Sequence, residues 1–333
     1  MKIIVEKNIP YIMGLLEPFG SVEYLAASDI DADAVKDADA LFIRTRTRCN
    51  ASLLDGSRVR FIATATIGTD HIDLEYCKAA EIAVFNAPGC NAPAVAQYVF
   101  AVIGTVFGEE FADKTLGVVG VGNVGSIIAR WGERLGMKVL KCDPPRRRAE
   151  GGDFVTIEEI AAKADIITFH TPLNREGADR TFHLADSDWL NSLSQCQLLI
   201  NSARGEIVDN AALVEALKTK KISAAAIDCW EGEPEINTEL LQLVNIATPH
   251  IAGYSAEGKS RATAMAIEAF EKFYGVTVTG KPNVVAPAKG ADITSIKQVT
   301  DSYDPRIDTR NLRSNPKQFE SLRNNYNLRS EVI

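Results

Sequence analysis

Short apolar runs alternate with helix-like stretches along most of the chain. The runs KIIVE (residues 2–6) and VRFIATA (59–65) are bounded by turn residues, and their β-branched and aromatic side chains are typical of buried strands. Strands that alternate with helices predict a parallel sheet covered by helices on both faces. We therefore expect an α/β fold.

The alternation occurs in two series, which predicts two domains. The first series ends near residue 93. It is followed by AVAQYVFAVIGTVFG at 94–108, which contains Gln97 and is shorter than the ~18 apolar residues of a membrane-spanning helix. We interpret this stretch as a buried helix that links the two domains. The second series starts at Leu116.

These patterns set the expected boundaries. Residues 1–93 form a first domain, which the region around an amphipathic helix at about 256–280 completes, and residues 94–255 form the second domain. Residues 281–333 begin with the linker-like stretch TGKPNVVAPAKGADI and continue with a polar stretch rich in arginine and asparagine. We interpret the polar stretch as either a small helical appendage or a frayed tail.

Composition narrows the class of protein. Of the 333 residues, 46% are hydrophobic and 24% are charged, as in ordinary globular proteins. The net charge of −8 gives no support to binding of nucleic acid or a membrane surface. The six cysteines form no C-x-x-C pair, so we expect reduced thiols and no metal site. The N-terminus lacks a signal-peptide pattern, which favours a cytoplasmic location.

The stretch VVGVGNVGS places Gly120, Gly122 and Gly125 in G-x-G-x-x-G spacing. The spacing alone is weak evidence, but here it follows an apolar strand and opens a helix. In that context the glycines allow a tight turn, the approach of a pyrophosphate and close packing of the helix. The first helical residues, Asn123 and Val124, would offer backbone N–H groups to the phosphates. We predict a dinucleotide-binding site.

Asp143 ends the next apolar run, about 20 residues further on, where an acid accepts hydrogen bonds from the ribose hydroxyls. Because a carboxylate also repels a 2′-phosphate, the sequence predicts NAD over NADP. The neighbouring Arg146, Arg147 and Arg148 keep NADP as an alternative, since an arginine can accommodate the additional phosphate.

Three further segments end in residues suited to acid–base chemistry. They are INSARGEIVD with Arg204, DCWEGEPE with Glu233, and TPHIAGY with His250. Ligands bind beyond the carboxyl ends of parallel strands, so all three could meet the cofactor. Pro234 after the glutamate and Pro249 before the histidine restrain both backbones. Each residue alone has a simpler interpretation, as a surface ion pair, a solvated loop acid or a buried ring.

Together, on a dinucleotide-binding domain, these three residues favour hydride transfer from a 2-hydroxy acid. Histidine can take the hydroxyl proton near neutral pH. A glutamate bonded to the other ring nitrogen would fix the histidine tautomer, and an arginine would bind the substrate carboxylate. We predict Arg204, Glu233 and His250 as the catalytic residues.

The motifs around these residues resemble those of the D-isomer-specific 2-hydroxyacid dehydrogenase family, and they occur in the family's order. Besides the glycine loop they are HTPLN, NSARGEIVD, EGEP and TPHIAG, which start at His170, Asn201, Glu231 and Thr248. The resemblance implies two doubly wound parallel-sheet domains, a flavodoxin-like substrate domain and a Rossmann NAD domain. It also implies a homodimer with part of its interface in the C-terminal segment.

The same resemblance implies further site residues. For NAD, the matching positions are Thr171, Ser202, Ala203, Asp228 and Gly253. For the substrate, they are Thr45, Thr66 and Tyr254. The segments ATIGTDHID, NAPGCNAPAVAQYVF, CDPPR and WEGEPEIN resemble one branch of the family, whose substrate is a small phosphorylated 2-hydroxy acid.

The segment IRTRTRC suggests a place for the substrate phosphate. If the segment is extended, Arg44, Arg46 and Arg48 share one face, and Thr45 and Thr47 share the other. Hydroxyl groups and at least one arginine, with Arg44 as the first candidate, could then hold the phosphate. Solvated loop arginines explain the pattern equally well.

Two alternatives remain for the function. The first is another enzyme of the same family, such as a D-3-phosphoglycerate dehydrogenase or a glyoxylate reductase, because the catalytic residues act on the shared 2-hydroxy acid unit. The second is a binding protein that uses the same scaffold as an NAD-sensing corepressor. Turnover of NAD with a small phosphorylated acid would discriminate between these classes.

Overall fold

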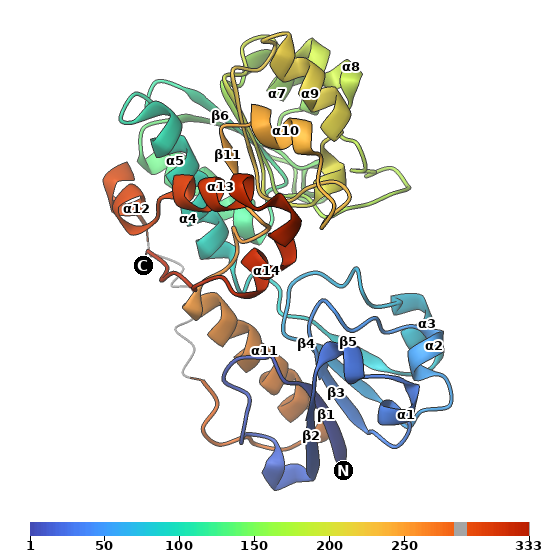
Figure 1. Cartoon of the computed structure of the whole chain (residues 1–333). Helices are drawn as coiled ribbons and strands as arrows, with labels where there is room; N and C mark the ends of the chain where they lie inside the picture. The colour runs from blue at the N-terminus through green and yellow to red at the C-terminus, as the bar shows by residue number, and fades with distance from the viewer. Residues whose placement is uncertain (283–291, 333) are drawn as a thin grey trace. The chain divides into compact units, whose positions relative to one another are not determined.

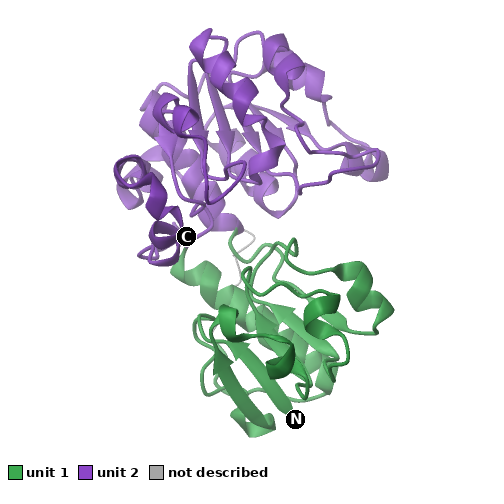
Figure 2. Cartoon of the chain, turned by 45° about the vertical axis from the view of Figure 1, so that its right-hand side comes forward, with its two compact units in different colours: residues 1–91, 255–289 green, residues 92–254, 290–333 purple. Residues whose placement is uncertain are grey.

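The computed structural model describes residues 1–282 and 292–332, which divide into two compact units (Figure 2). Unit 1 comprises residues 1–91 and 255–289, and unit 2 comprises residues 92–254 and 290–333. Most of the linker-like stretch, residues 283–291, lies outside the described residues. The C-terminal segment that follows belongs to unit 2 and forms helices, so it is an appendage rather than a frayed tail.

Unit 1 contains a five-stranded parallel sheet in the order β2-β1-β3-β4-β5 (Figure 1). This is the strand order of a flavodoxin-like domain. The strands are β1 (Lys2–Glu6), β2 (Ser21–Leu25), β3 (Ala40–Ile43), β4 (Phe61–Thr64) and β5 (Ala83–Phe85). Strand β2 has an edge position and only partly buried side chains, and its sequence SVEYL lacks the apolar run that predicted the other strands.

Helices cover both faces of this sheet. The short helices α1 (Ala32–Val35), α2 (Ala51–Leu54) and α3 (Leu74–Ala79) contribute to one core, and α11 (Ala256–Tyr274) packs on the opposite face. Phe270 of α11 lies 5.6 Å from the ring of Phe42, which belongs to β3. Two short 3-10 helices, η1 (Glu17–Phe19) and η2 (Ala27–Asp29), connect the first strands.

Unit 2 contains a six-stranded parallel sheet in the order β11-β10-β9-β8-β6-β7 (Figure 1). Its strands are β6 (Thr115–Val119), β7 (Lys138–Cys142), β8 (Ile166–Phe169), β9 (Leu198–Asn201), β10 (Ala224–Ile227) and β11 (Ile246–Ala247). The chain reverses its direction of winding between β6 and β8, which are adjacent. In open parallel sheets, ligands bind at such a switch point, beyond the carboxyl ends of the strands.

Two hydrophobic cores fill the faces of the second sheet. One contains α4 (Ala92–Phe107), α5 (Asn123–Arg134) and α12 (Ile296–Ser302). The other contains α7 (Ile157–Lys163), α8 (Ser187–Ser192), α9 (Asn210–Lys218), α10 (Thr238–Leu243), α13 (Pro305–Ser314) and α14 (Phe319–Asn324). The remaining short elements are α6 (Pro144–Glu150), η3 (Gly205–Ile207) and η4 (Pro316–Gln318).

Helix α4 corresponds to the apolar stretch that predicted a buried helix, and most of its residues are buried. Within residues 1–282 and 292–332, no helix combines the length and the apolar character that crossing a membrane requires.

Candidate active site

The loops that follow the strands of unit 2 are joined by backbone hydrogen bonds. Asp228, directly after β10, donates its N–H to the carbonyl of Asn201 at the end of β9, at 2.9 Å. His250 in turn donates its N–H to the carbonyl of Asp228, also at 2.9 Å. The sequence segments that end in Arg204, Glu233 and His250 therefore start from neighbouring strand ends.

Glu233 and His250 form a hydrogen-bonded pair. The Nδ1 atom of His250 lies 2.8 Å from Oε2 and 3.1 Å from Oε1 of Glu233. The backbone N–H of Trp230 donates to the same Oε1 at 2.8 Å, which fixes the carboxylate. Burial acts to raise the pKa of Glu233, but the charge and hydrogen bond of His250, together with the Trp230 bond, lower it below its usual value. The glutamate is therefore held as a carboxylate beside the ring.

The backbone of His250 adopts a left-handed conformation, with φ of +57°. This region is uncommon outside glycine and costs about 1–3 kcal/mol for a residue that the surroundings must hold there. Asp228 supplies much of that restraint, because its buried carboxylate accepts N–H bonds from Ile251 at 2.7 Å and Ala252 at 3.0 Å. The hydroxyl of Thr248 donates to it at 2.7 Å. The loop around the histidine is thus fixed from both sides.

Asp228 is an expected NAD contact, but its carboxylate is buried and bonded to protein groups. Its side chain is 1% exposed and is used by the loop that carries His250. Burial raises the pKa of Asp228, and the charge of His250 and the three hydrogen bonds oppose that rise. The carboxylate therefore has a structural role at the site, whatever its backbone contacts.

Arg204 follows β9 and the Ser202–Ala203 pair. Its Nη1 donates to the carbonyl of Ala203 at 2.8 Å, and its own carbonyl accepts from Nδ2 of Asn201 at 2.9 Å. Burial raises the pKa of the neighbouring Cys229 thiol well above its usual value, and the positive charge of Arg204 acts against that rise. Arg204 is consequently close to the loop that contains Glu233.

The glycine loop has the geometry that its spacing predicted. Gly120 has a φ of +86°, and a Cβ atom there would lie 2.7 Å from the backbone carbon of His170. A Cβ on Gly125 would lie 2.0 Å from the carbonyl oxygen of Gly120, so helix α5 can approach the loop only with glycine at this position. Gly122 and Asn123 are exposed, with open space where a Cβ on Gly122 would lie.

Asp143 connects the end of β7 to this loop. Its Oδ2 accepts from the N–H of Val121 at 2.8 Å, and its Oδ1 accepts from the N–H of Arg146 at 3.0 Å. The guanidinium of Arg146 is already paired with both oxygens of Glu150, at 2.6 and 2.8 Å. Arg146, one of the three arginines that kept NADP as an alternative, therefore has an acidic partner, whereas the carboxylate that favours NAD borders the loop.

Two hydroxyl groups at the strand ends fit a bound cofactor. The Oγ1 of Thr171, after β8, and the Oγ of Ser202, after β9, are buried without a hydrogen-bond partner among the described residues. Buried polar atoms are normally satisfied, so a ligand with polar groups would remove this cost. Together with Gly122 and Asp143, these atoms make the carboxyl end of the sheet suitable for a dinucleotide.

The segment IRTRTRC of unit 1 is not extended, so its predicted alternation is wrong. Strand β3 ends at Ile43, and a turn follows at residues 45–46. The reason is the buried carboxylate of Glu6, which accepts from the N–H of Arg44 at 2.8 Å and from the hydroxyl of Thr47 at 3.1 Å. Thr47 is therefore buried, whereas Thr45 is exposed.

The other substrate candidates of unit 1 lie just beyond β3 and β4. The Nη1 of Arg44 donates to the carbonyl of Asn8 at 3.1 Å, and its buried Nε has no hydrogen-bond partner among the described residues. The hydroxyl of Thr66 lies 2.7 Å from that of Thr64. Thr64 also lies 3.3 Å from Nε2 of His71, which gives this histidine a local partner.

The structure adds two residues that the sequence did not indicate. Arg323, in α14 of the C-terminal segment, has its Nη1 3.7 Å from Oε2 of Glu233. Cys229 offers a sulfur that, with one ligand atom each of Glu233 and His250, forms a group within 4.8 Å. Such a group could hold a metal ion, but the thiol is buried and its pKa is raised well above the usual value, so it resists giving up its proton. Cys229 lies in the segment DCWEGEPE that the sequence assigned to the site, but its residue type gave no reason to single it out, and no sequence signal connected Arg323 to the site.

Comparisons with known proteins place the chain among related sequences. The sequence model for the NAD binding domain of the D-isomer specific 2-hydroxyacid dehydrogenases matches residues 97–252. An erythronate-4-phosphate dehydrogenase from Bacteroides thetaiotaomicron is 46% identical over 340 residues, which cover 99% of this chain and 97% of that protein. An Escherichia coli protein of the same name is 42% identical over 348 residues, covering 99% of this chain and 92% of that protein.

Solved structures resemble the chain over most of its length. D-lactate dehydrogenase from Aquifex aeolicus, complexed with NAD and lactic acid, is 26% identical with a TM-score of 0.71, and the match covers 83% of this chain and 96% of that one. NAD-bound 3-phosphoglycerate dehydrogenase from Entamoeba histolytica is 26% identical with a TM-score of 0.69, and the match covers 85% and 98%.

Proposed function

The chain belongs to the D-isomer specific 2-hydroxyacid dehydrogenase family, and we propose that it oxidises 4-phospho-D-erythronate to 3-hydroxy-2-oxo-4-phosphooxybutanoate, a step of pyridoxal 5′-phosphate biosynthesis. It is an NAD-dependent oxidoreductase. The observation that carries the chemistry is the Glu233–His250 pair, held on a restrained loop at the carboxyl end of a dinucleotide-binding sheet. The choice of substrate is supported by the two relatives that match almost the whole chain.

His250 is the proposed acid–base. Because its Nδ1 is bonded to Glu233, Nε2 is the ring nitrogen left for the proton of the substrate hydroxyl. When bound, NAD would accept the hydride from the substrate carbon that carries this hydroxyl group. Glu233 stabilises the imidazolium that results, and it keeps the ring in one orientation for the return of the proton in the reverse direction.

Arg204 is proposed to bind the substrate carboxylate. Its guanidinium can donate two parallel hydrogen bonds to a carboxylate, which orients the 2-hydroxy acid and polarises the carbonyl that forms. The hydrogen bond of Asn201 to its backbone and the buried position of Ala203 support a fixed approach of this side chain.

NAD would be held by the glycine loop and the strand ends. The proposed contacts are the backbone of Gly120, Gly122, Asn123, Val124 and Gly125, the carboxylate of Asp143, and residues Thr171, Ser202, Ala203, Asp228 and Gly253. The buried hydroxyls of Thr171 and Ser202, which lack a hydrogen-bond partner in the described part of the chain, support their part in this set. The paired state of Arg146 supports NAD rather than NADP, since its charge is already neutralised by Glu150.

Four residues are proposed to bind the substrate. Three belong to unit 1, namely Arg44, Thr45 and Thr66, and the fourth, Tyr254, belongs to unit 2. The buried Nε of Arg44 has no hydrogen-bond partner within residues 1–282 and 292–332, and this supports a role for its guanidinium in holding the phosphate, which could accept from it.

The oligomeric state and the location of the protein are also part of the proposal. We expect a homodimer that acts in the cytoplasm, and the six free, buried cysteines are compatible with a reducing compartment. Light scattering of the purified protein would test the dimer, and a mass equal to one chain at assay concentration would contradict it.

The test of the proposed function is NADH formation on mixing the purified protein with NAD and 4-phospho-D-erythronate. D-3-phosphoglycerate serves as the control substrate, and a 2-oxo acid is added in a parallel reaction to reoxidise any tightly held NADH. We expect turnover of the erythronate ester alone. Turnover of D-3-phosphoglycerate alone would replace the substrate but keep the mechanism, and no turnover with either acid would contradict an enzymatic role.

A further inference from the structure

We infer that Arg323, in the C-terminal helix α14, is a positioning residue of the active site, which holds the Glu233 carboxylate and the Tyr254 hydroxyl in place beside His250. The inference rests on the proposed function of that pair. Arg323 lies outside residues 97–252, the part of the chain that the family's NAD-binding model matches. The C-terminal segment would therefore be a part of the active site and not only an appendage.

The guanidinium of Arg323 contacts two groups of the candidate site at once. Its Nε donates to the hydroxyl of Tyr254 at 3.2 Å, and its Nη1 lies 3.7 Å from Oε2 of Glu233. That same Oε2 is the oxygen 2.8 Å from Nδ1 of His250. One carboxylate oxygen is thus shared between the imidazole and the guanidinium.

The burial of this group favours a functional contact over a surface ion pair. The side chains of Arg323 and Glu233 are 13% and 17% exposed. Charges at that depth are costly unless they are paired and hydrogen-bonded. Burial acts to lower the pKa of Arg323, but Tyr254 and Glu233 raise it, so the guanidinium stays charged. Its charge is also one cause of the low pKa of Glu233.

Arginine suits this position because its planar fork can donate to two acceptors in fixed directions. Here the hydrogen bond from Nε orients Tyr254, a proposed substrate contact, and the ion pair of Nη1 at 3.7 Å holds the carboxylate that orients the acid–base. A lysine would keep the positive charge, but its ammonium could not reach both groups with the same geometry. The residue would thus connect substrate binding to the orientation of His250.

The C-terminal segment is anchored firmly enough to place Arg323 precisely. Phe319, the first residue of α14, is fully buried in the core of unit 2. The hydroxyl of Thr309 accepts from the N–H of Ala247 in β11 at 3.0 Å. Arg329 donates to the carbonyl of Ile251 at 3.1 Å and to that of Ala252, both in the His250 loop. The segment is therefore bonded to this loop at several points.

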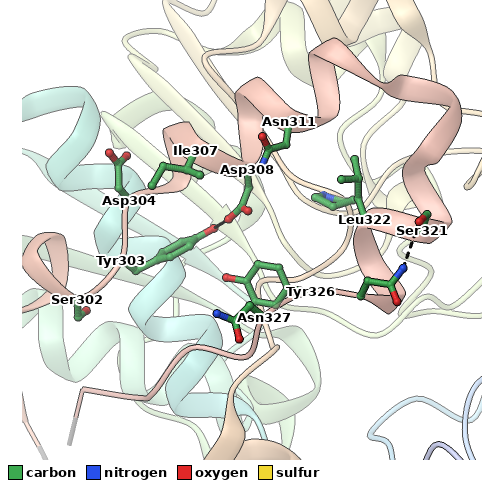
Figure 3. A pocket seen from close by; sticks show the side chains of 12 residues that line it. Ser302, Tyr303, Asp304, Ile307, Asp308, Asn311, Ser321, Leu322, Tyr326 and Asn327 are labelled. Atoms are coloured by element: carbon green, nitrogen blue, oxygen red, sulfur yellow. Dashed lines mark hydrogen bonds between the residues drawn. The ribbon is translucent and has the colours of Figure 1, made fainter.

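A cavity of about 540 Å³ lies along the same contact (Figure 3). Pro249, which precedes His250, lines it together with Leu322, the neighbour of Arg323. Tyr303 and Asp308 line it as well, and the tyrosine hydroxyl donates to the aspartate at 2.8 Å. Hydrogen bonds to neighbouring loops and the burial of Phe319 together set the position of α14 beside this cavity.

The charge of Arg323 should appear in the pH profile. The titratable and charged groups around the His250 loop are Glu233, Asp228, Cys229, Tyr254, Arg204, Arg323 and Arg329. The Arg323 guanidinium places a positive charge 3.7 Å from the carboxylate of the acid–base pair, and this charge opposes the uptake of a further proton there. Its removal should therefore move the acidic limb of kcat/KM for oxidation to higher pH.

The experiment compares Arg323→Gln, Arg323→Lys and Arg313→Gln with the wild-type enzyme. Arg313→Gln is the matched control, because Arg313 is on the same segment and donates to the carbonyls of Leu241 and Val244, which are not part of the candidate site. For Arg323→Gln we expect kcat/KM to fall about tenfold, with the shifted acidic limb and unchanged NAD affinity. Arg323→Lys should restore the limb but remain about threefold below wild type. Arg313→Gln should keep the wild-type profile.

The outcomes distinguish a failure of the proposed function from a failure of the role of Arg323. An inactive wild-type enzyme would contradict the proposed function, whereas an active wild type with an unchanged pH profile in Arg323→Gln would overturn the role of Arg323. If Arg323→Gln does not fold, Arg323→Lys decides the matter, because a wild-type kcat/KM in that variant would contradict the two-contact geometry. A shifted limb in Arg313→Gln would also overturn the inference, since it would reflect general loosening of the segment.

Discussion

The carboxylate of Asp228 accepts a 2.7 Å hydrogen bond from the backbone N–H of Ile251, and this contact helps to hold His250 in its left-handed conformation. An acid at the end of one strand thereby fixes the loop after the next strand. The geometry of the acid–base pair depends on this support as much as on the pair itself.

Asp228→Asn should test that dependence. The amide keeps one acceptor oxygen but places an NH₂ group against a backbone donor, so one buried N–H loses its partner. We expect the free energy of unfolding to fall by about 1–3 kcal/mol and kcat to fall by about tenfold, since the histidine is no longer held in place. Urea titration and steady-state kinetics would measure both, and normal kcat in a folded variant would show that the loop is fixed by other contacts.

Glu233→Ala and His250→Ala should each reduce turnover by roughly 100-fold or more, the usual scale for the loss of general acid–base help. NAD affinity, measured by fluorescence titration, should change little, because the side chains of Glu233 and His250 are not among the proposed cofactor contacts. The double variant should be little worse than His250→Ala, since the glutamate acts through the histidine. Near-normal turnover of His250→Ala would mean that another group is the base.

Arg44→Ala should mainly raise KM for the phosphorylated acid, with a smaller effect on kcat. The expected increase is about tenfold, because a charge-assisted hydrogen bond to a phosphate is lost. Arg58→Ala is a suitable control, since this arginine is also in unit 1 and is exposed in an ion pair with Asp39. Equal KM values in wild type and Arg44→Ala would exclude Arg44 from the phosphate site.

His170 should make unit 2 less stable in acid. Burial lowers its pKa from 6.5 to about 3, so below pH 6.5 the unfolded chain binds a proton that the folded chain does not. The free energy of unfolding should therefore decrease as pH falls from about 6.5 toward 3, at up to about 1.4 kcal/mol per pH unit. Above pH 6.5 this histidine contributes no pH dependence.

Urea unfolding of wild type and His170→Gln near pH 7 and near pH 5 would measure this effect. Tryptophan fluorescence reports on unit 2, because Trp131, Trp189 and Trp230 all lie in that unit. The wild type should lose about 1–2 kcal/mol more than the variant between the two pH values. An identical loss in both proteins would show that His170 is protonated as easily in the folded state as in the unfolded one.

The sequence by itself determined the order of strands and helices and the chemistry at the strand ends. Apolar runs and turn residues are local signals, and the carboxyl ends of parallel strands meet at one edge of a sheet, so Gly120, Asp143, Arg204 and His250 could be assigned to one region. The glycine loop could also be predicted, because a left-handed backbone and a close helix approach both require glycine, which the sequence shows directly. The motifs of this region also indicated the family.

Only the tertiary structure decided which distant side chains hold the loops after the strands of each unit. The turn after β3 arises because a carboxylate from β1, on Glu6, binds Arg44 and Thr47, a contact that no local pattern predicts. The burial of Asp228 and the approach of Arg323 to Glu233 likewise depend on segments that are distant in the chain. Strand spacing and periodicity are short-range properties, whereas hydrogen-bond partners across a core are chosen by packing, and for that reason the supporting residues became visible only in the folded chain.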